Sequence, residues 1–315
     1  MFGYILRRIL QSIPVVLLVT IGAFSVIVLV PGDPAQHMLG YNATPESLRI
    51  LREQLGLDRS ISQQFWDFFR GVVVGDFGES ILKKESVRTV VGERAIVSLF
   101  LLGYAVLVAL LISIPIAIVS ALRKNRWPDH ILRLTSMITF AMPSFWLGLL
   151  LALWFGLYLG WFPVGGYNDG SIFKAFHTLT LPAVTVGLYL APLLARSLRS
   201  SLIEELDRDY VDAARARGFA ESRVVGKHVL RNSLISTVTV LSLNVGYLLS
   251  GTVIVENVFA IPGLGTLIVD AVMQRDYPLI QALTLFFGVA VIATNLLADL
   301  SYAVLDPRIR LSRKR

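Results

Sequence analysis

The chain has 315 residues, of which 55% are hydrophobic and 16% charged, and its mean hydropathy is +0.66. This is too apolar for a soluble protein of this size and indicates a membrane protein. The net charge of +7 gives no reason to expect nucleic acid binding, because no basic stripe interleaves with aromatic residues. The absence of cysteine excludes disulfides, thiolate catalysis and zinc–thiolate sites.

Six charge-free intervals, each longer than 20 residues, are the expected membrane spans. A helix of about 20 residues crosses a bilayer core of roughly 30 Å. One charge at mid-membrane costs about 2.5–3.5 kcal/mol, so six clean intervals do not arise by accident. The sequence therefore predicts an all-α integral membrane protein with six transmembrane helices. The intervals are Ile9–Val30, Ala95–Leu122, Leu134–Asn168, Ala175–Ala195, Asn232–Val255 and Tyr277–Ala298.

Basic residues set the predicted orientation. With Met1 inside, the inner segments hold 19 of the 29 lysines and arginines, and the two short outer loops hold only Lys174 and Arg275. This bias predicts an N-in, C-in arrangement. The apolar run after Arg7 and Arg8 reaches Val30 without a small-x-small cleavage site, so we expect a retained helix and not a signal peptide.

The segment between the first two spans, residues 31–94, is predicted to be an extracytoplasmic loop, and it is long enough to hold short helices of its own. Thr44 followed by Pro45 is typical of a helix start, and that helix should end at Gln54 or Leu55. Gln63–Phe69 is amphipathic and rich in aromatic residues, and a glycine-rich turn follows at Gly75–Ser80.

Helix breakers interrupt the later spans. Pro143-Ser144 predicts a tolerated kink in the third, and Pro182 and Pro192 predict a bent fourth. The glycines and prolines between the fifth and sixth spans favour a folded or re-entrant outer turn.

Polar and small residues mark the last two spans. Asn244, Tyr247 and Gly251 share one helical face, with Ser250 close by. Thr284, Gly288 and Asn295 form a similar stripe in the sixth span. Polar groups in lipid tend to face a pore or another helix, so these residues either line a translocation path or pack helices closely.

The most distinctive segment is the hydrophilic loop from Ser197 to Arg231. Counted with Arg196, it holds eight basic and six acidic residues. Tyr210–Arg217 contains good helix formers, Gly218 can end that helix in a left-handed conformation, and a second helix can begin near Glu221. The residues of this loop alone are compatible either with a solvated helical hairpin or with a docking surface for a soluble partner.

Asp212-Ala213-Ala214, followed by Gly218, resembles the cytoplasmic EAA loop of ABC-importer permeases, and Asp209–Asn232 is similar to their peptide/nickel branch. The resemblance covers nearly the whole chain and consists of short sequence motifs, here called phrases, that occur in the same order as in the family. Two positions depart from the family pattern, with Asp212 in place of the usual glutamate and Ser236 in place of a proline. The other matching phrases are Pro31–Ala35, Gly75–Ser80, Val255–Phe259, Pro262–Gly265 and Asp306–Arg310.

The resemblance implies a fold like that of type I ABC-importer permeases and a heteromeric assembly in the bacterial inner membrane. Its expected partners are a second homologous permease, two ATPase subunits that bind ATP and Mg, an extracytoplasmic solute-binding protein and the lipid bilayer. The implied ATPase-coupling residues are Tyr210, Asp212, Ala213, Ala214, Arg215, Arg217, Gly218 and Phe219. The candidate contacts on the outer face are Asp76, Glu79, Glu256 and Asn257.

We find no catalytic motif or metal-binding motif in the sequence. Gly226-Lys227 is the nearest approach to a phosphate loop, but Glu221 holds its first glycine position and His228 follows the lysine. No paired carboxylates lie in the six spans, so neither an intramembrane protease nor a proton-driven carrier is indicated. The resemblance, together with the missing catalytic motifs, implies a non-catalytic subunit of an importer for peptides or related small solutes. A stand-alone secondary transporter or channel is the alternative.

The sequence does not identify the cargo, which could be a dipeptide, an oligopeptide, glutathione, a nickel complex or an opine.

The expected organisation of the chain has three parts. They are residues 1–30 with the first helix, the loop 31–94, and a five-helix core over 95–315 with a coupling loop at about 197–235.

Overall fold

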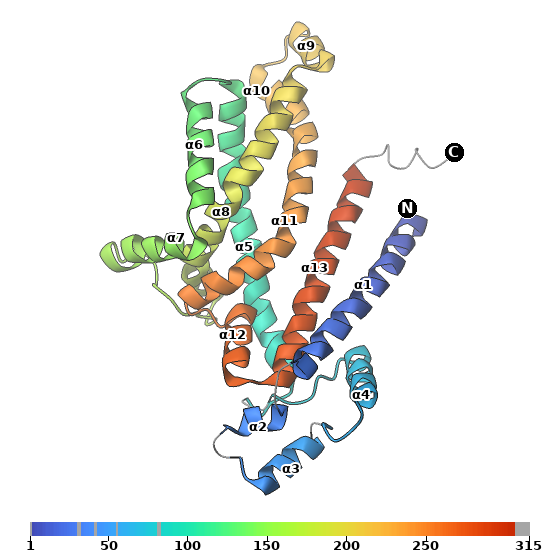
Figure 1. Cartoon of the computed structure of the whole chain (residues 1–315). Helices are drawn as coiled ribbons and strands as arrows, with labels where there is room; N and C mark the ends of the chain where they lie inside the picture. The colour runs from blue at the N-terminus through green and yellow to red at the C-terminus, as the bar shows by residue number, and fades with distance from the viewer. Residues whose placement is uncertain (1, 30–32, 41–42, 55, 81–82, 306–315) are drawn as a thin grey trace. The chain divides into compact units, whose positions relative to one another are not determined.

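The computed structural model describes residues 2–29, 33–40, 43–54, 56–80 and 83–305, and within them the only β feature is one isolated bridge between Glu79 and Ser86. The chain forms two units: residues 99–261 with 294–305, here the first unit, and residues 2–98 with 262–293, the second. Figure 1 labels the elements except for the two π-helices, η2 and η3. The elements are α1 (Phe2–Leu29), α2 (Pro34–Leu39), α3 (Pro45–Gln54), α4 (Ile61–Val74), α5 (Val87–Leu122), α6 (Trp127–Ala141), α7 (Ser144–Leu151), the π-helix η2 (Ala152–Tyr158), α8 (Ile172–Leu206), α9 (Asp209–Ala216), α10 (Glu221–Arg223), the π-helix η3 (Val224–Val229), α11 (Leu230–Val258), α12 (Leu264–Gln274) and α13 (Tyr277–Leu305).

Among the residues that the structure describes, five helices are long and apolar enough to cross a membrane, and a bent helix pair makes a sixth candidate if it counts as one span. This confirms the predicted all-α membrane fold. The five long candidates are Leu6–Leu29, Val87–Leu122, Ile172–Leu206, Glu221–Val258 and Tyr277–Leu297.

The third predicted span is not one kinked helix, and here the prediction is corrected. α6 ends at Ala141, Met142 is extended at φ −88° and ψ 129°, and a new helix starts at Ser144. The two pieces, Trp127–Thr139 and Ser144–Tyr158, meet at 105°. Pro143 explains the break, because proline disfavours a helical conformation in the residue before it and lacks an N–H.

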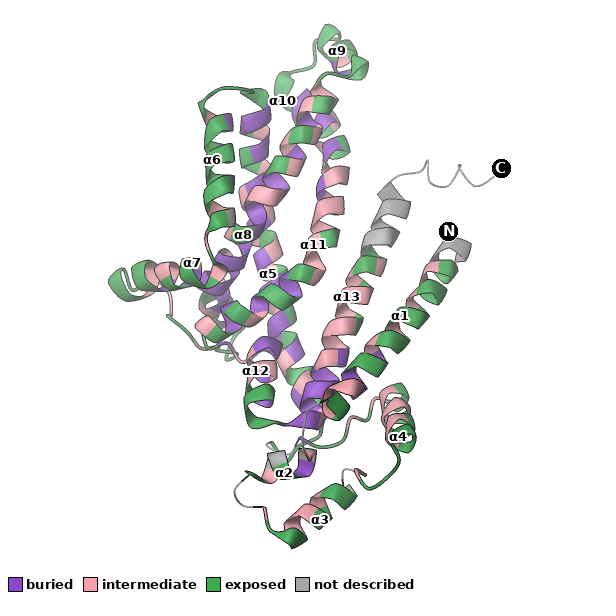
Figure 2. Cartoon of the chain, in the orientation of Figure 1, coloured by how far each residue is buried: buried purple, intermediate pink, exposed green. Residues whose placement is uncertain are grey.

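The first unit is built around α8, whose buried face packs against α6, α7 and α11. Figure 2 shows this helix with buried residues along most of its length. Gly187 permits close contact with α5, since a Cβ there would lie 2.8 Å from Val108 Cγ1 and 3.1 Å from the Ala105 carbonyl oxygen. Many apolar side chains on the outside of the bundle are exposed, as expected for a surface that faces lipid or a partner.

The second unit has its core where α12 meets the beginnings of α5 and α13. Val87, Leu264 and Leu283 are fully buried there. The Leu264 N–H donates to Ser98 Oγ at 2.8 Å, and Ser80 Oγ donates to Asp276 Oδ2 at 2.6 Å. The predicted folded turn between the last two spans is therefore an 11-residue helix with a defined core.

The predicted local elements of the long outer loop are confirmed. α3 begins after Thr44, whose Oγ1 accepts from the Ser47 N–H at 3.1 Å, as an N-cap does. α4 extends the predicted aromatic helix in both directions, and Phe24 of α1 packs edge-on against Phe65 with ring centroids 5.3 Å apart. The phrase Asp306–Arg310 lies outside the described residues.

Candidate functional site

The chain between α8 and η3, residues 207–223, forms a short helical projection, here called the knob. α8 continues to Leu206, so the first ten residues of the predicted loop belong to that helix. α9 then ends in a Schellman motif, in which the Gly218 N–H bonds to the Arg215 carbonyl at 2.9 Å and the Phe219 N–H to the Ala214 carbonyl at 3.3 Å. Gly218 has φ +78°, the left-handed conformation that favours glycine.

Polar bonds brace this knob from within. Arg215 donates to both carboxylate oxygens of Glu221, at 3.1 and 2.7 Å, which ties α9 to α10. These hydrogen bonds raise the pKa of the Arg215 guanidinium and lower the pKa of the Glu221 carboxyl, so both groups stay ionised at neutral pH. Tyr210 donates to Glu205 Oε2 at 2.6 Å and accepts from Asn232 Nδ2 at 3.3 Å. Burial and the bond to Glu205 raise the pKa of the Tyr210 phenol, which keeps it a donor.

A buried valine anchors the knob to the helices of the first unit. Val211 is fully buried, and it belongs to the same apolar cluster as Val224 and Val229 of the returning chain. Burying such a side chain contributes about 1.5–3 kcal/mol. The knob is therefore an extension of the bundle rather than a loose loop. The other cluster members are Ala117 and Ala121 of α5, Leu132 of α6, and Ala195, Leu198 and Leu202 of α8.

The predicted coupling residues lie together on the outside of this knob. Tyr210, Ala213, Arg217 and Phe219 are exposed, and so is Gly218 at the turn. Asp212 has 78% of its side chain exposed and Arg215 41%, while Ala214 is half-buried. The rim of the surface is ordered as well, since the Arg223 guanidinium lies 5.2 Å from the Phe219 ring centroid.

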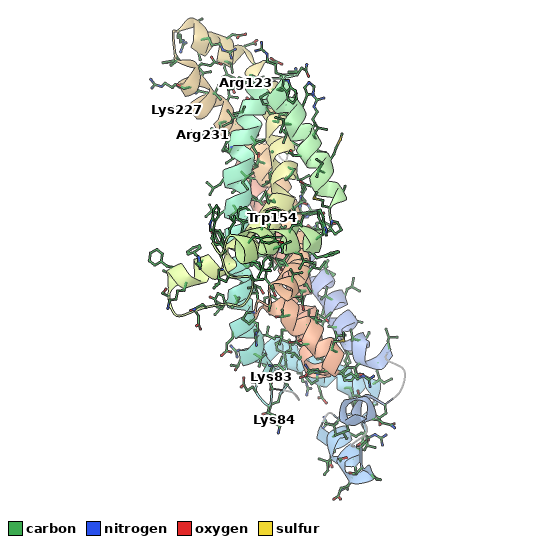
Figure 3. The ribbon with its side chains drawn as sticks, turned by 90° about the vertical axis from the view of Figure 1, so that its left-hand side faces the viewer. Lys83, Lys84, Arg123, Trp154, Lys227 and Arg231 are labelled. Atoms are coloured by element: carbon green, nitrogen blue, oxygen red, sulfur yellow. The ribbon has the colours of Figure 1, made fainter. Side chains whose placement is uncertain are left out.

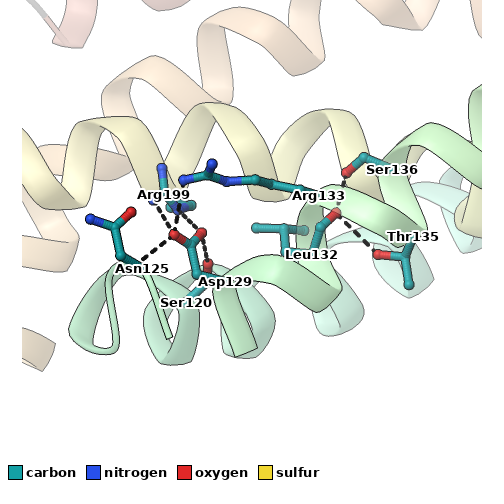
Figure 4. A network of polar contacts seen from close by, with 8 residues as sticks. All are labelled: Ser120, Asn125, Asp129, Leu132, Arg133, Thr135, Ser136 and Arg199. Atoms are coloured by element: carbon teal, nitrogen blue, oxygen red, sulfur yellow. Dashed lines mark hydrogen bonds and ion pairs between the residues drawn. The ribbon is translucent and has the colours of Figure 1, made fainter. Parts of the chain in front are cut away.

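Sequence reasoning missed a buried ionic network at this end of the first unit (Figure 4). Asp129 in the first turn of α6 is completely buried and forms an ion pair with Arg199 of α8, with Nε at 2.5 Å from Oδ1 and Nη2 at 2.7 Å from Oδ2. Ser120 Oγ, the Asn125 N–H and Arg133 Nη2 also donate to it, at 2.9, 3.0 and 3.1 Å. One carboxylate thus joins α5, α6 and α8.

A second feature of the first unit is a pocket of about 560 Å³ at the Pro143 break. It brings together Asn244, Tyr247 and Gly251, three of the residues predicted to line a pathway. Tyr247 is 80% exposed, and a Cβ on Gly251 would meet nothing within 4 Å, so among the described residues of this chain no other helix packs closely against this glycine. The remaining lining residues are Ala141, Met142, Pro143, Ser144, Val186, Tyr189, Leu190, Leu193, Leu248 and Val255.

The other predicted pathway residues are not among those that line this pocket. Ser250 is exposed on α11, Asn295 is exposed on the part of α13 in the first unit, and Thr284 is half-buried in the second unit. Close packing explains Gly288, because a Cβ there would overlap Val19 Cγ1 of α1. The stripe on the sixth span therefore contains at least one residue that packs helices.

The four candidate outer-face residues differ in exposure. Asp76 is exposed and its Oδ1 accepts from the Gly78 N–H at 3.0 Å, while Glu79 is exposed beside an open pocket of about 750 Å³ in the second unit. Asn257 is exposed on α11. Glu256 is fully buried, which corrects its assignment as a surface contact. Among the residues described, no cluster of three acidic or histidine side chains could hold a metal ion.

Sequence comparison identifies the class of protein to which this helical fold, with its knob between α8 and α11, belongs. The model of the binding-protein-dependent transport system inner membrane component matches residues 113–311, and the model of its N-terminal part matches residues 1–94. The chain belongs to this family: it is a multi-pass inner-membrane permease subunit of a bacterial ABC importer.

Among its relatives is the glutathione transport system permease protein GsiC of Salmonella choleraesuis strain SC-B67, 39% identical over 98% of this chain and 99% of that protein. The GsiC protein of Escherichia coli K12 is 37% identical over the same shares. The fold is similar to a chain of the MetNI methionine ABC transporter in an inward-facing conformation. That match has a TM-score of 0.53 and 14% identity, and covers 69% of this chain and 96% of the other.

Proposed function

We propose that this permease forms half of the pathway of an ATP-driven importer for peptides or related small solutes, and that its 209–232 loop receives the motion of an ATPase subunit. The observation that carries this proposal is the exposed surface Asp212–Gly218 on a knob whose Val211 is locked into the bundle core. A force applied to the knob therefore reaches α5, α6 and α8 directly.

The proposed transmission of motion depends on the rigidity of the knob. The Schellman bonds at Gly218 and the Arg215–Glu221 pair fix the shape of the knob. Closure of the ATPase subunits would displace the knob together with its core cluster and shift the bundle between inward-facing and outward-facing populations. ATP and Mg would be held by the ATPase, and this chain would supply only the mechanical contact.

The pocket at Pro143 supports passage of a polar solute. Its described lining offers an amide, the phenols of Tyr189 and Tyr247, a serine hydroxyl and apolar surface, but no charged side chain. Such a surface contacts peptide groups through neutral hydrogen bonds and does not hold them by ion pairing. The names of the GsiC relatives make glutathione, a small peptide, the first cargo to test.

The proposed assembly contains a second homologous permease, two ATPase subunits and an extracytoplasmic binding protein. With both termini inside, the knob would face the cytoplasm. The exposed Asp76, Glu79 and Asn257 are then candidates for contact with the binding protein.

Filling the pocket should block uptake. Gly251→Leu is expected to lower ATP-dependent glutathione or dipeptide uptake in proteoliposomes at least about tenfold, a rise of ~1.4 kcal/mol in the barrier. Gly103→Leu is the matched control, because Gly103 is also an exposed helical glycine of the first unit with nothing within 4 Å of a Cβ. Gly103 does not line the pocket, so its variant should transport like the wild type.

The same vesicles separate the two candidate functions. An importer subunit transports only with its ATPase subunits, binding protein and ATP present. Uptake by the isolated chain without nucleotide would identify a stand-alone transporter or channel, and equal uptake by the Gly251→Leu and Gly103→Leu variants would remove the pocket from the pathway.

A further inference from the structure

The turn between α5 and α6 carries a basic pocket that the coupling function does not use. Arg123, Lys124, Arg126 and His130 are all exposed. Figure 3 shows Arg123 at the end of the first unit that also carries Lys227 and Arg231. The pocket is open, measures about 620 Å³, and is lined by Arg123, Asn125, Arg126, Trp127, Pro128 and His130.

The positive charge of this pocket is not neutralised from within the turn. Asp129 is the only acidic residue between Arg123 and Arg133, and it is completely buried against Arg199 and Arg133. In the described part of the chain, no side-chain hydrogen bond or ion pair engages Arg123 or Arg126. The acid is thus held in the interior while the guanidinium groups face outward, which leaves a local positive potential.

An apolar ridge continues from the pocket along α6. Trp127, Ile131, Leu134 and Ile138 recur at the spacing of one helical face. Their exposed fractions are 79%, 49%, 57% and 51%. A tryptophan at the junction of a basic and an apolar surface is typical of the membrane–water interface.

We propose that this pocket binds the phosphate headgroup of an anionic phospholipid, with the acyl chains lying along the Trp127–Ile138 ridge. Basic pockets beside transmembrane helices on the cytoplasmic side bind such headgroups. A soluble phosphate compound would use the arginines and leave the ridge without a partner, so the combination selects an amphiphile. The inference rests on the proposed function only in assigning the site to the inner leaflet.

Native mass spectrometry of the purified full-length chain in detergent tests this site directly. Phosphatidylglycerol should be retained well above phosphatidylcholine. Arg123→Gln with Arg126→Gln should weaken that retention about 25-fold, at about fivefold for each charge lost near the surface. Lys227→Gln with Arg231→Gln removes the same charge from the same end but outside the pocket, and should weaken retention less than about threefold.

Each arm has an outcome that overturns the proposal. Equal losses in the two double variants would mean general surface charge and no site. Competition by inorganic phosphate or glycerol phosphate at the same concentration as the lipid would make a free phosphate compound the ligand. If thermal unfolding shows that the pocket variant does not fold, Ile131→Gln with Leu134→Gln tests the same site independently. This ridge variant should keep the arginines but lose retention at least about fivefold.

A protein partner is the remaining alternative. A photo-crosslinking residue at Trp127 in the reconstituted transporter should capture phosphatidylglycerol, and capture of an ATPase or permease subunit instead would overturn the proposal. Because lipid retention is measured without ATPase or transport, a failure of coupling leaves this result unaffected, and a failure of lipid retention leaves coupling unaffected.

Discussion

Gly218→Val is expected to reduce ATP-dependent uptake at least about tenfold while the protein still inserts normally in the membrane. Gly218 has φ +78°, and a β-branched residue in this left-handed region carries about 1–2 kcal/mol of strain. Relieving the strain requires the α9 terminus to unwind, which breaks the bonds from Gly218 and Phe219 to the helix carbonyls. The knob would then no longer present Asp212–Gly218 in one shape.

The control separates backbone strain from loss of contact surface. Asparagine tolerates the left-handed conformation, so Gly218→Asn should retain uptake within about threefold. A Cβ on Gly218 meets nothing within 4 Å in this chain, so neither variant clashes internally. Reconstituted vesicles should show ATP hydrolysis in the Gly218→Val transporter that no longer drives uptake. Wild-type uptake by that variant would remove the knob from the coupling mechanism.

Asp129→Asn is expected to destabilise the protein by about 3 kcal/mol, because it leaves the guanidinium of Arg199, only 17% exposed, without its carboxylate. For a chain of this size, such a loss lowers Tm by roughly 4–5 °C. Thermal unfolding of the purified protein in detergent measures the shift. Replacing both partners, in Asp129→Leu with Arg199→Met, should recover part of the loss, because Arg199 no longer leaves an unpaired charge while Ser120 and the Asn125 N–H still lose their acceptor.

Asp212→Asn is the matched control for the buried acid. Its side chain is 78% exposed and its nearest basic partner, Arg215, lies at 3.5 Å, so the change should cost no more than about 0.5 kcal/mol. Given the unfolding entropy of a chain this long, the Tm of Asp129→Asn should lie several degrees below that of Asp212→Asn. A Tm for Asp129→Asn within about 2 °C of the control would show that the network does not hold α5, α6 and α8 together.

Local features of the fold were predictable where the signal lies in neighbouring residues. Charge-free length identified the spans, Thr44-Pro45 identified the start of α3, and the position of Gly218 identified the end of α9. Each rests on a rule about consecutive residues: solvation of charges in lipid, capping of free N–H groups, or left-handed backbone.

Features that depend on distant parts of the chain were not predictable in this way. Asp129 and Arg199 are 70 residues apart, and nothing local distinguishes a buried acid from one that faces water. Glu256 was likewise placed outside because it sits near the end of a span, whereas packing buries it completely. Pro143 signalled a kink, but the 105° angle depends on how α7 packs against α8 and α11.

The candidate site was predictable to a similar extent. The exposed coupling residues follow from charge and helix propensity, while their anchor, Val211, is an ordinary apolar residue whose role emerges only from the core around it. The face carrying Asn244, Tyr247 and Gly251 was visible from helical spacing, whereas the pocket also needs the break at Pro143 and the side chains of α8.

Site-specific crosslinking in the assembled transporter measures the coupling contact most directly. A photo-crosslinking residue at Ala213, on the exposed knob, is compared with one at Ser171, at the opposite end of α8. We predict covalent capture of the ATPase subunit from Ala213, changing in yield between the nucleotide-free and ATP-bound states, and none from Ser171. An intact, transporting assembly in which Ala213 captures no ATPase subunit in either state would contradict the account.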